Sequence, residues 1–174
     1  MARRGRVPAQ PQAHSSGSRG TFPAMSDAAV GLPTIGIIGL GNLGRPMAVS
    51  ALAAGYPLVV HSLSVHDAAH LLSQGAVWAP TVAEVGARSD VVITVLPGPR
   101  EVREIMIGEG GALAHMRPGS TFIDMSTSSV AVAEEVLALA APRGVAVMEA
   151  PVSFLAKAPI GDSRTTASLQ IFVG

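Results

Sequence analysis

Three glycines at the spacing G-x-G-x-x-G, Gly39, Gly41 and Gly44, are the residues of this 174-residue sequence best suited to bind a ligand. They separate a β-branched run, Thr34–Gly39, from a segment with apolar residues at helical spacing, Leu43–Ala54. The first glycine permits a tight turn, the second lets the backbone approach a ligand, and the third lets the helix pack close to the strand. Because a helix N-terminus offers N–H donors and a positive dipole end, the pattern predicts a diphosphate site, as in NAD or NADP.

A carboxylate about 20 residues further on, at the end of the next strand, would bind the ribose 2′-hydroxyl of NAD. The second predicted strand, Pro57–His61, is followed here by Ser62 and Leu63, and the nearest acid, Asp67, falls in the next predicted helix. We therefore expect no carboxylate placed to repel a 2′-phosphate and no arginine placed to bind one. The Ser62 hydroxyl can hydrogen-bond to either form of the ribose, so the choice between NAD and NADP stays open.

Strand-like and helix-like segments alternate along the chain. The predicted strands are Thr34–Gly39, Pro57–His61, Val91–Leu96, Thr121–Asp124, Val145–Glu149 and Ser168–Val173. The predicted helices are Leu43–Ala54, Val65–Gln74, one after the Pro97–Pro99 turn, and Ser129–Ala140, which opens on a serine cap. Short strands that are apolar on both faces indicate a mostly parallel sheet covered by helices on both sides. We expect an α/β fold of the Rossmann type, doubly wound, in a single domain.

Four stretches agree in order and spacing with one known family: GIIGLGNLGRPMA (Gly36–Ala48), DVVITVLP (Asp90–Pro97), FIDMSTS (Phe122–Ser128) and EAPVS (Glu149–Ser153). Together they resemble the β-hydroxyacid dehydrogenases, which include 3-hydroxyisobutyrate dehydrogenase and tartronate semialdehyde reductase and have a 6-phosphogluconate dehydrogenase-like NAD(P)-binding domain. The resemblance covers roughly residues 33–174. It implies reversible NAD(P)-linked oxidation of a small 3-hydroxy acid to its semialdehyde.

The resemblance also implies roles for matched positions. The glycine turn would bind pyrophosphate, Leu96 and Pro97 would lie against the cofactor, and Ser126 and Thr127 would sit where nicotinamide and substrate meet. Ser153 would face the substrate carboxylate. With Ser62 added, the predicted cofactor contacts are Gly39, Leu40, Gly41, Asn42, Leu43, Gly44, Ser62, Leu96, Pro97 and Thr127. No catalytic residue and no metal ligand is assigned, and Asp124 either caps the next turn or lines the site.

The sequence departs from the family at several places, among them an apparent insertion between Ser153 and Ser168. The family ends its second strand with Asn-Arg or Asp-Arg and follows Pro-Val-Ser with two glycines, whereas this chain has Ser62-Leu63 and Phe154-Leu155. The family's catalytic lysine lies on a long helix beyond this domain, before an all-helical domain, and the sole lysine here, Lys157, does not match it. We therefore expect residues 34–174 to be the nucleotide-binding domain of a truncated chain with little turnover. A catalytically inactive NAD(P)-binding sensor or interaction module is the alternative.

Composition narrows the remaining function classes. The absence of cysteine excludes disulfides and Cys-ligated metals, and an aromatic content of 3% argues against single-stranded nucleic-acid binding. No uninterrupted apolar run reaches about 18 residues, so we expect no membrane partner. His66 and His70 are four residues apart but lack a third ligand, which favours a hydrated helix face. The expected partner is a small 3-hydroxy acid or semialdehyde, once a helical domain completes the site. Apolar surface left bare without that domain could produce a homo-oligomer.

Residues 1–33 differ from the rest of the chain. They carry four arginines against a single acid, Asp27, with few large apolar side chains. We expect a disordered, Arg-bearing tail. It is either a non-functional extension, with Met25 opening a shorter chain, or an organelle transit peptide. The expected location is the cytoplasm, or a mitochondrion or plastid if the tail is a transit peptide.

Overall fold

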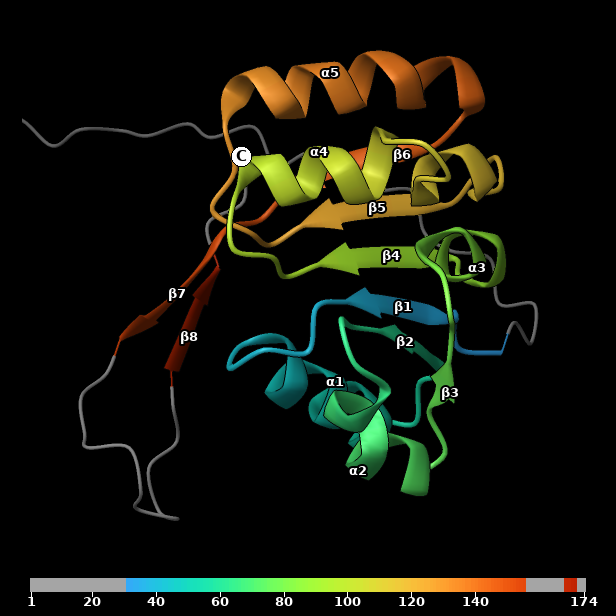
Figure 1. The fold of residues 1–174 in the computed structure, drawn as a ribbon, viewed down its shortest axis with the longest axis vertical. Coiled ribbons are helices and arrows are strands. Elements are labelled where there is room, and N and C mark those ends of the chain that lie inside the picture. Colours follow the sequence, from blue (N-terminus) through green and yellow to red (C-terminus); the bar gives the residue numbers. More distant parts are fainter. Residues whose placement is uncertain (1–30, 156–167, 172–174) are drawn as a thin grey trace, which may run out of the picture. The chain divides into compact units, whose positions relative to one another are not determined.

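Residues 31–155 and 168–171 are described by a computed structural model (Figure 1). Six parallel strands form one sheet in the order β3-β2-β1-β4-β5-β6. These strands are β1 Ile35–Ile38, β2 Leu58–His61, β3 Val77–Trp78, β4 Val91–Thr94, β5 Thr121–Asp124 and β6 Ala146–Glu149. The connecting helices are α1 Gly44–Ala53, α2 Ala69–Ser73, α3 Val82–Arg88, α4 Pro99–Ile107 and α5 Val130–Ala140. Short 3₁₀ turns are η1 Val65–Ala68, η2 Ala112–His115 and η3 Ala141–Arg143. The predicted α/β fold with a doubly wound parallel sheet is confirmed.

Successive residues of a strand point to opposite faces of the sheet. Because β1 and β2 are apolar at consecutive positions, both faces of the sheet are apolar. On one side, Ile37 of β1 and Val60 of β2 pack in a cluster with Ala48 of α1 and Leu71 of α2, all buried. This cluster fixes α1 against the strand that precedes it. It thereby sets the position of the glycine turn between the two.

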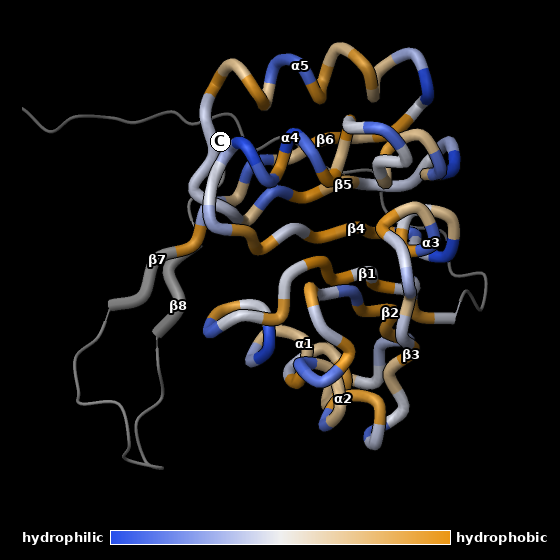
Figure 2. The backbone as a smooth tube through the Cα atoms, in the orientation of Figure 1, coloured by the Kyte–Doolittle hydropathy of each residue, from blue (hydrophilic) through white to orange (hydrophobic). Residues whose placement is uncertain are grey.

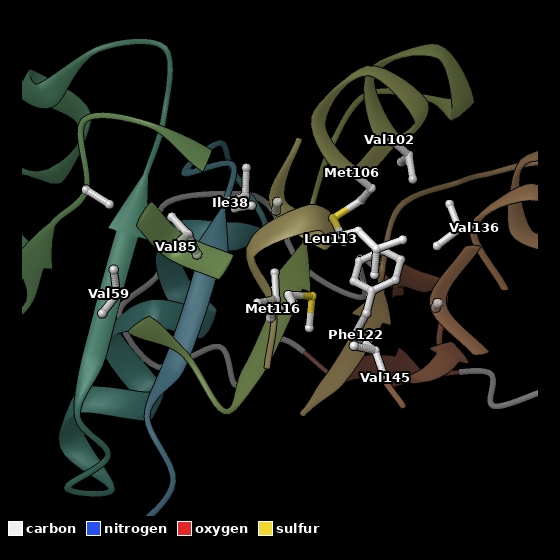
Figure 3. Packing of buried hydrophobic residues seen from close by; sticks show 14 residues of the cluster. Ile38, Val59, Val85, Val102, Met106, Leu113, Met116, Phe122, Val136 and Val145 are labelled. Carbon is white, nitrogen blue, oxygen red and sulfur yellow. The ribbon is translucent and has the colours of Figure 1, made fainter. Parts of the chain in front are cut away.

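The other face carries the larger cluster, beneath α3, α4, α5 and η2. Figure 3 shows Phe122 of β5 surrounded by Met106 of α4, Leu113 of η2 and Val136 of α5, and each is 3% exposed or less. Hydrophobic and hydrophilic residues alternate along α4 in Figure 2, as expected for a helix with one face on a core, whereas α5 is mostly hydrophobic with one hydrophilic stretch. The packing of this cluster therefore fixes the positions of β4 and β5 and of the loops at their carboxyl ends.

Side-chain caps determine where two of the helices begin. The Ser129 hydroxyl accepts a hydrogen bond from the Val132 N–H, which confirms the predicted serine cap of α5. The Thr81 hydroxyl accepts from the Glu84 N–H at 3.2 Å and starts α3, a helix that sequence analysis did not predict. Helix α3 has seven residues with a glycine, Gly86, in its interior, so its helical signal is weak.

Three further elements differ from expectation. Strand β3 was not predicted because it has two residues, one of them the exposed Val77. The predicted helix Val65–Gln74 is instead a 3₁₀ turn followed by one short α-helix. The segment from Ser168 does not extend the parallel sheet, because β8, Ser168–Ile171, pairs antiparallel with β7, Val152–Leu155, in a separate two-stranded sheet.

Several predictions fall outside the described residues. The expected tail lies there up to residue 30, as do Lys157 and the last two residues of the predicted strand Ser168–Val173. The structure describes the backbone of Ser153, Phe154 and Leu155 but not their side chains.

Candidate cofactor-binding site

A cavity of ≈680 Å³ lies at the carboxyl edge of the sheet, lined by the segments that follow β1, β2 and β4. The arrowheads of the strands in Figure 1 mark this edge. The strand order reverses here, because β2 and β3 lie on one side of β1 and β4 to β6 on the other. Ligands of open α/β sheets bind at such a switch point. The volume lies within the range of small-molecule sites, about 300–1,000 Å³.

The three glycines of the turn are required for different reasons. Gly39 has φ +101°, a conformation that side chains rarely adopt, and its N–H donates to the His61 carbonyl at 2.9 Å. A Cβ on Gly44 would clash with the Gly39 carbonyl oxygen. A Cβ on Gly41, by contrast, would meet no atom within 4 Å. Gly39 and Gly44 are thus needed by the fold itself, whereas the space above Gly41 is open to a ligand.

Helix α1 begins beside this space without a side-chain cap. Leu43 at the N-cap position makes no side-chain hydrogen bond, and the first turn carries no acidic residue. An uncapped N-terminus leaves backbone N–H donors and the positive end of the helix dipole available to an anion. The geometry suits a diphosphate lying across Gly41.

Buried polar contacts fix the loop that follows β4. The Leu96 N–H donates to the Ser126 hydroxyl at 2.9 Å. The Asp124 carboxylate accepts from the Thr94 hydroxyl at 2.8 Å and from the Ser126 N–H at 2.9 Å. Of the two roles considered for Asp124, the structure shows the cap of the following turn. Thr94, Asp124 and Ser126 are each at most 5% exposed, so this network positions Leu96 rigidly at the cavity wall.

A polar corner of the cavity is formed by Ser62, Asp67 and Arg45. The Ser62 hydroxyl donates to Asp67 Oδ2 at 3.0 Å, and Arg45 Nη2 lies 3.8 Å from Asp67 Oδ1. All three residues line the cavity. Contrary to expectation, a carboxylate with an arginine beside it therefore lies next to the end of β2. The 3₁₀ turn η1, capped by the Ser64 hydroxyl, brings Asp67 back beside the end of β2.

His61 forms the wall next to this corner. Its Nδ1 lies 2.9 Å from the Ala79 carbonyl oxygen, which accepts, so Nδ1 carries the proton. The ring also stacks on Trp78, with centroids 5.5 Å apart. These two contacts fix the orientation of the imidazole at the end of β2. Sequence analysis had not assigned His61 to the site.

Most of the predicted cofactor contacts come together at the cavity. Those that line it are Gly39, Leu40, Gly41, Asn42, Leu43, Gly44, Ser62, Leu96 and Pro97. Thr127 is exposed and is not part of the lining, and Ser126 is buried behind Leu96. The side chain of Ser153 lies outside the described residues. Lining residues missed from the sequence include Arg45, His61 and Asp67. Asp67 could have been found from the Ser-x-His-Asp start of η1, in which Ser64 caps a turn that reverses the chain.

Within residues 31–155 and 168–171, no three His, Asp or Glu side chains gather closely enough to hold a metal ion. No helix in this part of the chain has the length and apolar character to cross a bilayer.

Comparison with known proteins identifies the domain. The sequence pattern of the NAD binding domain of 6-phosphogluconate dehydrogenase matches residues 34–157, which include the glycine turn and the lining residues found in the described part of the chain. The chain belongs to this family. The 6-phosphogluconate dehydrogenase-type domain therefore confirms the resemblance on which the cofactor expectation rests, and its ligand is a nicotinamide dinucleotide, NAD or NADP.

The relatives of this chain that are named for an activity include several oxidoreductases. The probable mitochondrial 3-hydroxyisobutyrate dehydrogenase of Dictyostelium discoideum is 36% identical over 69% of this chain and 37% of its own length. The NAD-dependent L-serine dehydrogenase of Pseudomonas aeruginosa is 38% identical over 68% of this chain and 40% of its own. A Mycobacterium tuberculosis 3-hydroxyisobutyrate dehydrogenase structure with L-serine superposes with a TM-score of 0.63 at 38% identity, over 70% of this chain and 41% of that one. The chain spans about two fifths of the length of these relatives and carries the NAD-binding domain of 3-hydroxyisobutyrate dehydrogenase-like oxidoreductases.

The residues present fit a dinucleotide. Open space above Gly41 and the uncapped start of α1 suit the pyrophosphate, and the hydroxyl and carboxylate of the polar corner suit a ribose. The apolar side chains of Val95 and Leu96 line the cavity on its β4 side, where a flat ring could pack.

Proposed function

We propose that this chain binds NAD(P) in the cavity above the glycine turn and serves an oxidoreductase that acts on a small 3-hydroxy acid. The observation that carries the proposal is the open approach to Gly41 at the uncapped start of α1. The relatives described above, which are named as a probable 3-hydroxyisobutyrate dehydrogenase and an L-serine dehydrogenase, support the substrate class. Family membership favours this function over an inactive sensor or interaction module.

In this proposal each wall of the cavity binds one part of the cofactor. The backbone of Gly39 to Gly44 holds the pyrophosphate, and Ser62 contacts the adenosine ribose. Leu96 and Pro97 pack against the nicotinamide side, with Ser126 and Thr127 toward the substrate and Ser153 toward its carboxylate. Because Ser126 accepts a hydrogen bond from the Leu96 N–H, its own O–H remains free to donate.

When bound, the nicotinamide supplies hydride transfer, and the chain supplies binding and orientation. Transfer to a carbonyl also needs an acid that protonates the developing alkoxide, worth about 10²–10⁴ in rate. Of the side chains that line the cavity in the described part of the chain, those that titrate are Arg45, His61 and Asp67, which surround the polar corner. Because we assign this corner to the adenosine ribose, we assign no catalytic acid among these three residues.

The substitution Gly41→Val tests the site. A β-branched side chain at this position meets no protein atom within 4 Å but occupies the space of the pyrophosphate. We expect the wild-type chain to bind NADH or NADPH in a fluorescence titration and Gly41→Val to bind at least about tenfold more weakly, which corresponds to about 1.4 kcal/mol. The melting temperature without ligand should stay within about 2 °C of wild type.

Gly31→Val is the matched control, because a Cβ on Gly31 also meets nothing within 4 Å and Gly31 precedes β1, at the opposite edge of the sheet. This control should bind as the wild type does. Equal affinity of all three proteins, or no binding by the wild type, would disprove the proposed site.

For the cellular location we propose the cytoplasm, with a mitochondrion or plastid as the alternative if residues 1–33 act as a targeting peptide. The Dictyostelium relative is named as mitochondrial and the Pseudomonas relative is bacterial, so the relatives include both cases. Imaging of the full chain with a C-terminal fluorescent tag distinguishes the two.

A further inference from the structure

Among the described residues that line the cavity, the charged side chains, Arg45 and Asp67, both lie in the polar corner. Asp67 Oδ2 accepts a hydrogen bond from the Ser62 hydroxyl at 3.0 Å, and Asp67 Oδ1 lies 3.8 Å from Arg45 Nη2. The Ser62 hydroxyl stands directly after β2, where dinucleotide-binding folds usually place an acidic side chain. In this chain the carboxylate belongs to Asp67, five residues later in η1, and a hydrogen bond from the Ser62 hydroxyl holds it next to the end of β2.

Asp67 retains the capacity to bind a ligand. An ionised carboxylate has about four lone-pair sites, and the single hydrogen bond from Ser62 occupies one of them. The Asp67 side chain is 39% exposed, and Arg45, at 50%, lies beyond hydrogen-bond distance of it. Acceptor positions therefore remain open toward the cavity, where hydroxyl groups could donate to them.

The charges of the corner distinguish two kinds of ribose. A diol donates hydrogen bonds to a carboxylate, and such charge-assisted bonds are strong. A 2′-phosphate would bring about two negative charges and no donor next to Asp67. Arg45 offers limited compensation, because its guanidinium already faces that carboxylate.

We infer that Asp67, held by Ser62, selects a dinucleotide with a free 2′-hydroxyl, so that this domain prefers NAD(H) to NADP(H). The inference rests on the proposed function, because it requires the adenosine ribose to lie in the polar corner. It assigns the discriminating carboxylate to η1 instead of to the end of β2.

The test compares the dissociation constants of NADH and NADPH, measured separately by fluorescence titration at one fixed ionic strength. Wild type should bind NADH about tenfold or more tightly than NADPH, as expected for a hydrogen bond to a charged group. Asp67→Asn should reduce this ratio about tenfold, by weakening NADH and strengthening NADPH. Glu104→Gln, which removes an exposed negative charge on α4, controls for net charge and should keep the wild-type ratio.

A double variant distinguishes loss of the carboxylate from misfolding as the cause of a lost preference in Asp67→Asn. Ser62→Asp combined with Asp67→Asn returns a carboxylate to the end of β2 and should restore the preference for NADH. A ratio unchanged in Asp67→Asn, with both dinucleotides still bound, would overturn the inference and leave the proposed function intact. A wild-type preference for NADPH that Arg45→Gln abolishes would overturn it in favour of a phosphate site. Failure of the wild type to bind either dinucleotide would instead refute the proposed function.

Discussion

At the scale of single residues, Gly44 shows how closely the glycine turn is packed. A Cβ at this position would clash with the Gly39 carbonyl oxygen and contact the Val95 side chain at 3.4 Å. The clashing atom belongs to the backbone of a residue with φ +101°, so it cannot move aside without disturbing the turn. The third glycine of the motif is therefore a packing requirement of the free protein.

We predict that Gly44→Ala lowers the free energy of unfolding by about 1–3 kcal/mol, the usual cost of overpacking. Urea unfolding followed by circular dichroism measures this. Gly41→Ala, where the added methyl meets no atom within 4 Å, should change the stability by no more than about 0.5 kcal/mol. Equal stability of the two variants would contradict the distinction between the two glycines.

At the scale of elements, α3 contacts η2 through Gly86, a glycine in the interior of α3. Gly86 is buried, and a Cβ there would clash with the Ala112 carbonyl oxygen at the start of η2. Replacing a helical glycine by alanine ordinarily stabilises a helix by about 0.5–1 kcal/mol. In Gly86→Ala, the helix propensity of alanine would raise the free energy of unfolding, whereas the clash with Ala112 would lower it.

We predict that packing dominates, so that Gly86→Ala lowers the free energy of unfolding by about 1–3 kcal/mol. The exposed neighbour in the same helix supplies the control, because Ala87→Gly changes only the intrinsic preference and should cost about 0.5–1 kcal/mol. Thermal and urea unfolding of both variants give the answer. A gain in stability for Gly86→Ala would show that η2 moves away freely.

The elements that sequence analysis found have strong local signals. The glycine turn and the strands β1, β2, β4 and β5 could be predicted because each strand is buried or half-buried over several consecutive residues. Two of the four residues of β6 are exposed, but its apolar sequence still predicted a strand. The pair β3 and α3 could not be predicted, since two strand residues and a seven-residue helix with an interior glycine carry too little periodicity. Helix α3 packs against η2, a contact remote in the sequence, and β3 is placed by its pairing with β2.

The part of the site that could be predicted is the part with a strong local sequence signal. Backbone contacts at Gly39 to Gly44 follow from one continuous motif. The polar corner does not, because the contact of Ser62 with Asp67 depends on how tightly η1 turns. A helix beginning at Val65, as predicted, would be an α-helix with a different direction for Asp67. The buried position of Ser126 likewise follows from the Asp124 network, which links two strands 30 residues apart.

At the scale of the whole domain, stability should depend on pH through one pair of surface charges. Arg103 of α4 donates from Nε and Nη2 to the Glu135 carboxylate of α5 at 2.8 and 2.7 Å. These hydrogen bonds hold the pKa of Glu135 below its usual range. A lowered pKa in the folded state means that the pair stabilises the fold above the pKa of the unfolded chain. This contribution disappears as pH falls through the lowered value.

We predict that wild type loses more stability between neutral and acidic pH than Glu135→Gln does, in urea unfolding at a series of pH values. In Arg103→Met the pKa of Glu135 should rise toward its usual range, which carbon NMR of the side-chain carboxyl measures. Because both side chains are exposed, high salt should reduce the difference. Parallel pH profiles for wild type and Glu135→Gln would refute the role of this pair.

The stacking of His61 on Trp78 has a practical consequence. Trp78 is the sole tryptophan of the chain, and its ring stacks at 24° against an imidazole that lines the cavity. The indole therefore contacts a residue of the cavity wall, and its emission is free of background from any second indole. The chain carries its own optical probe, so occupancy beside β2 can be followed in real time without a label.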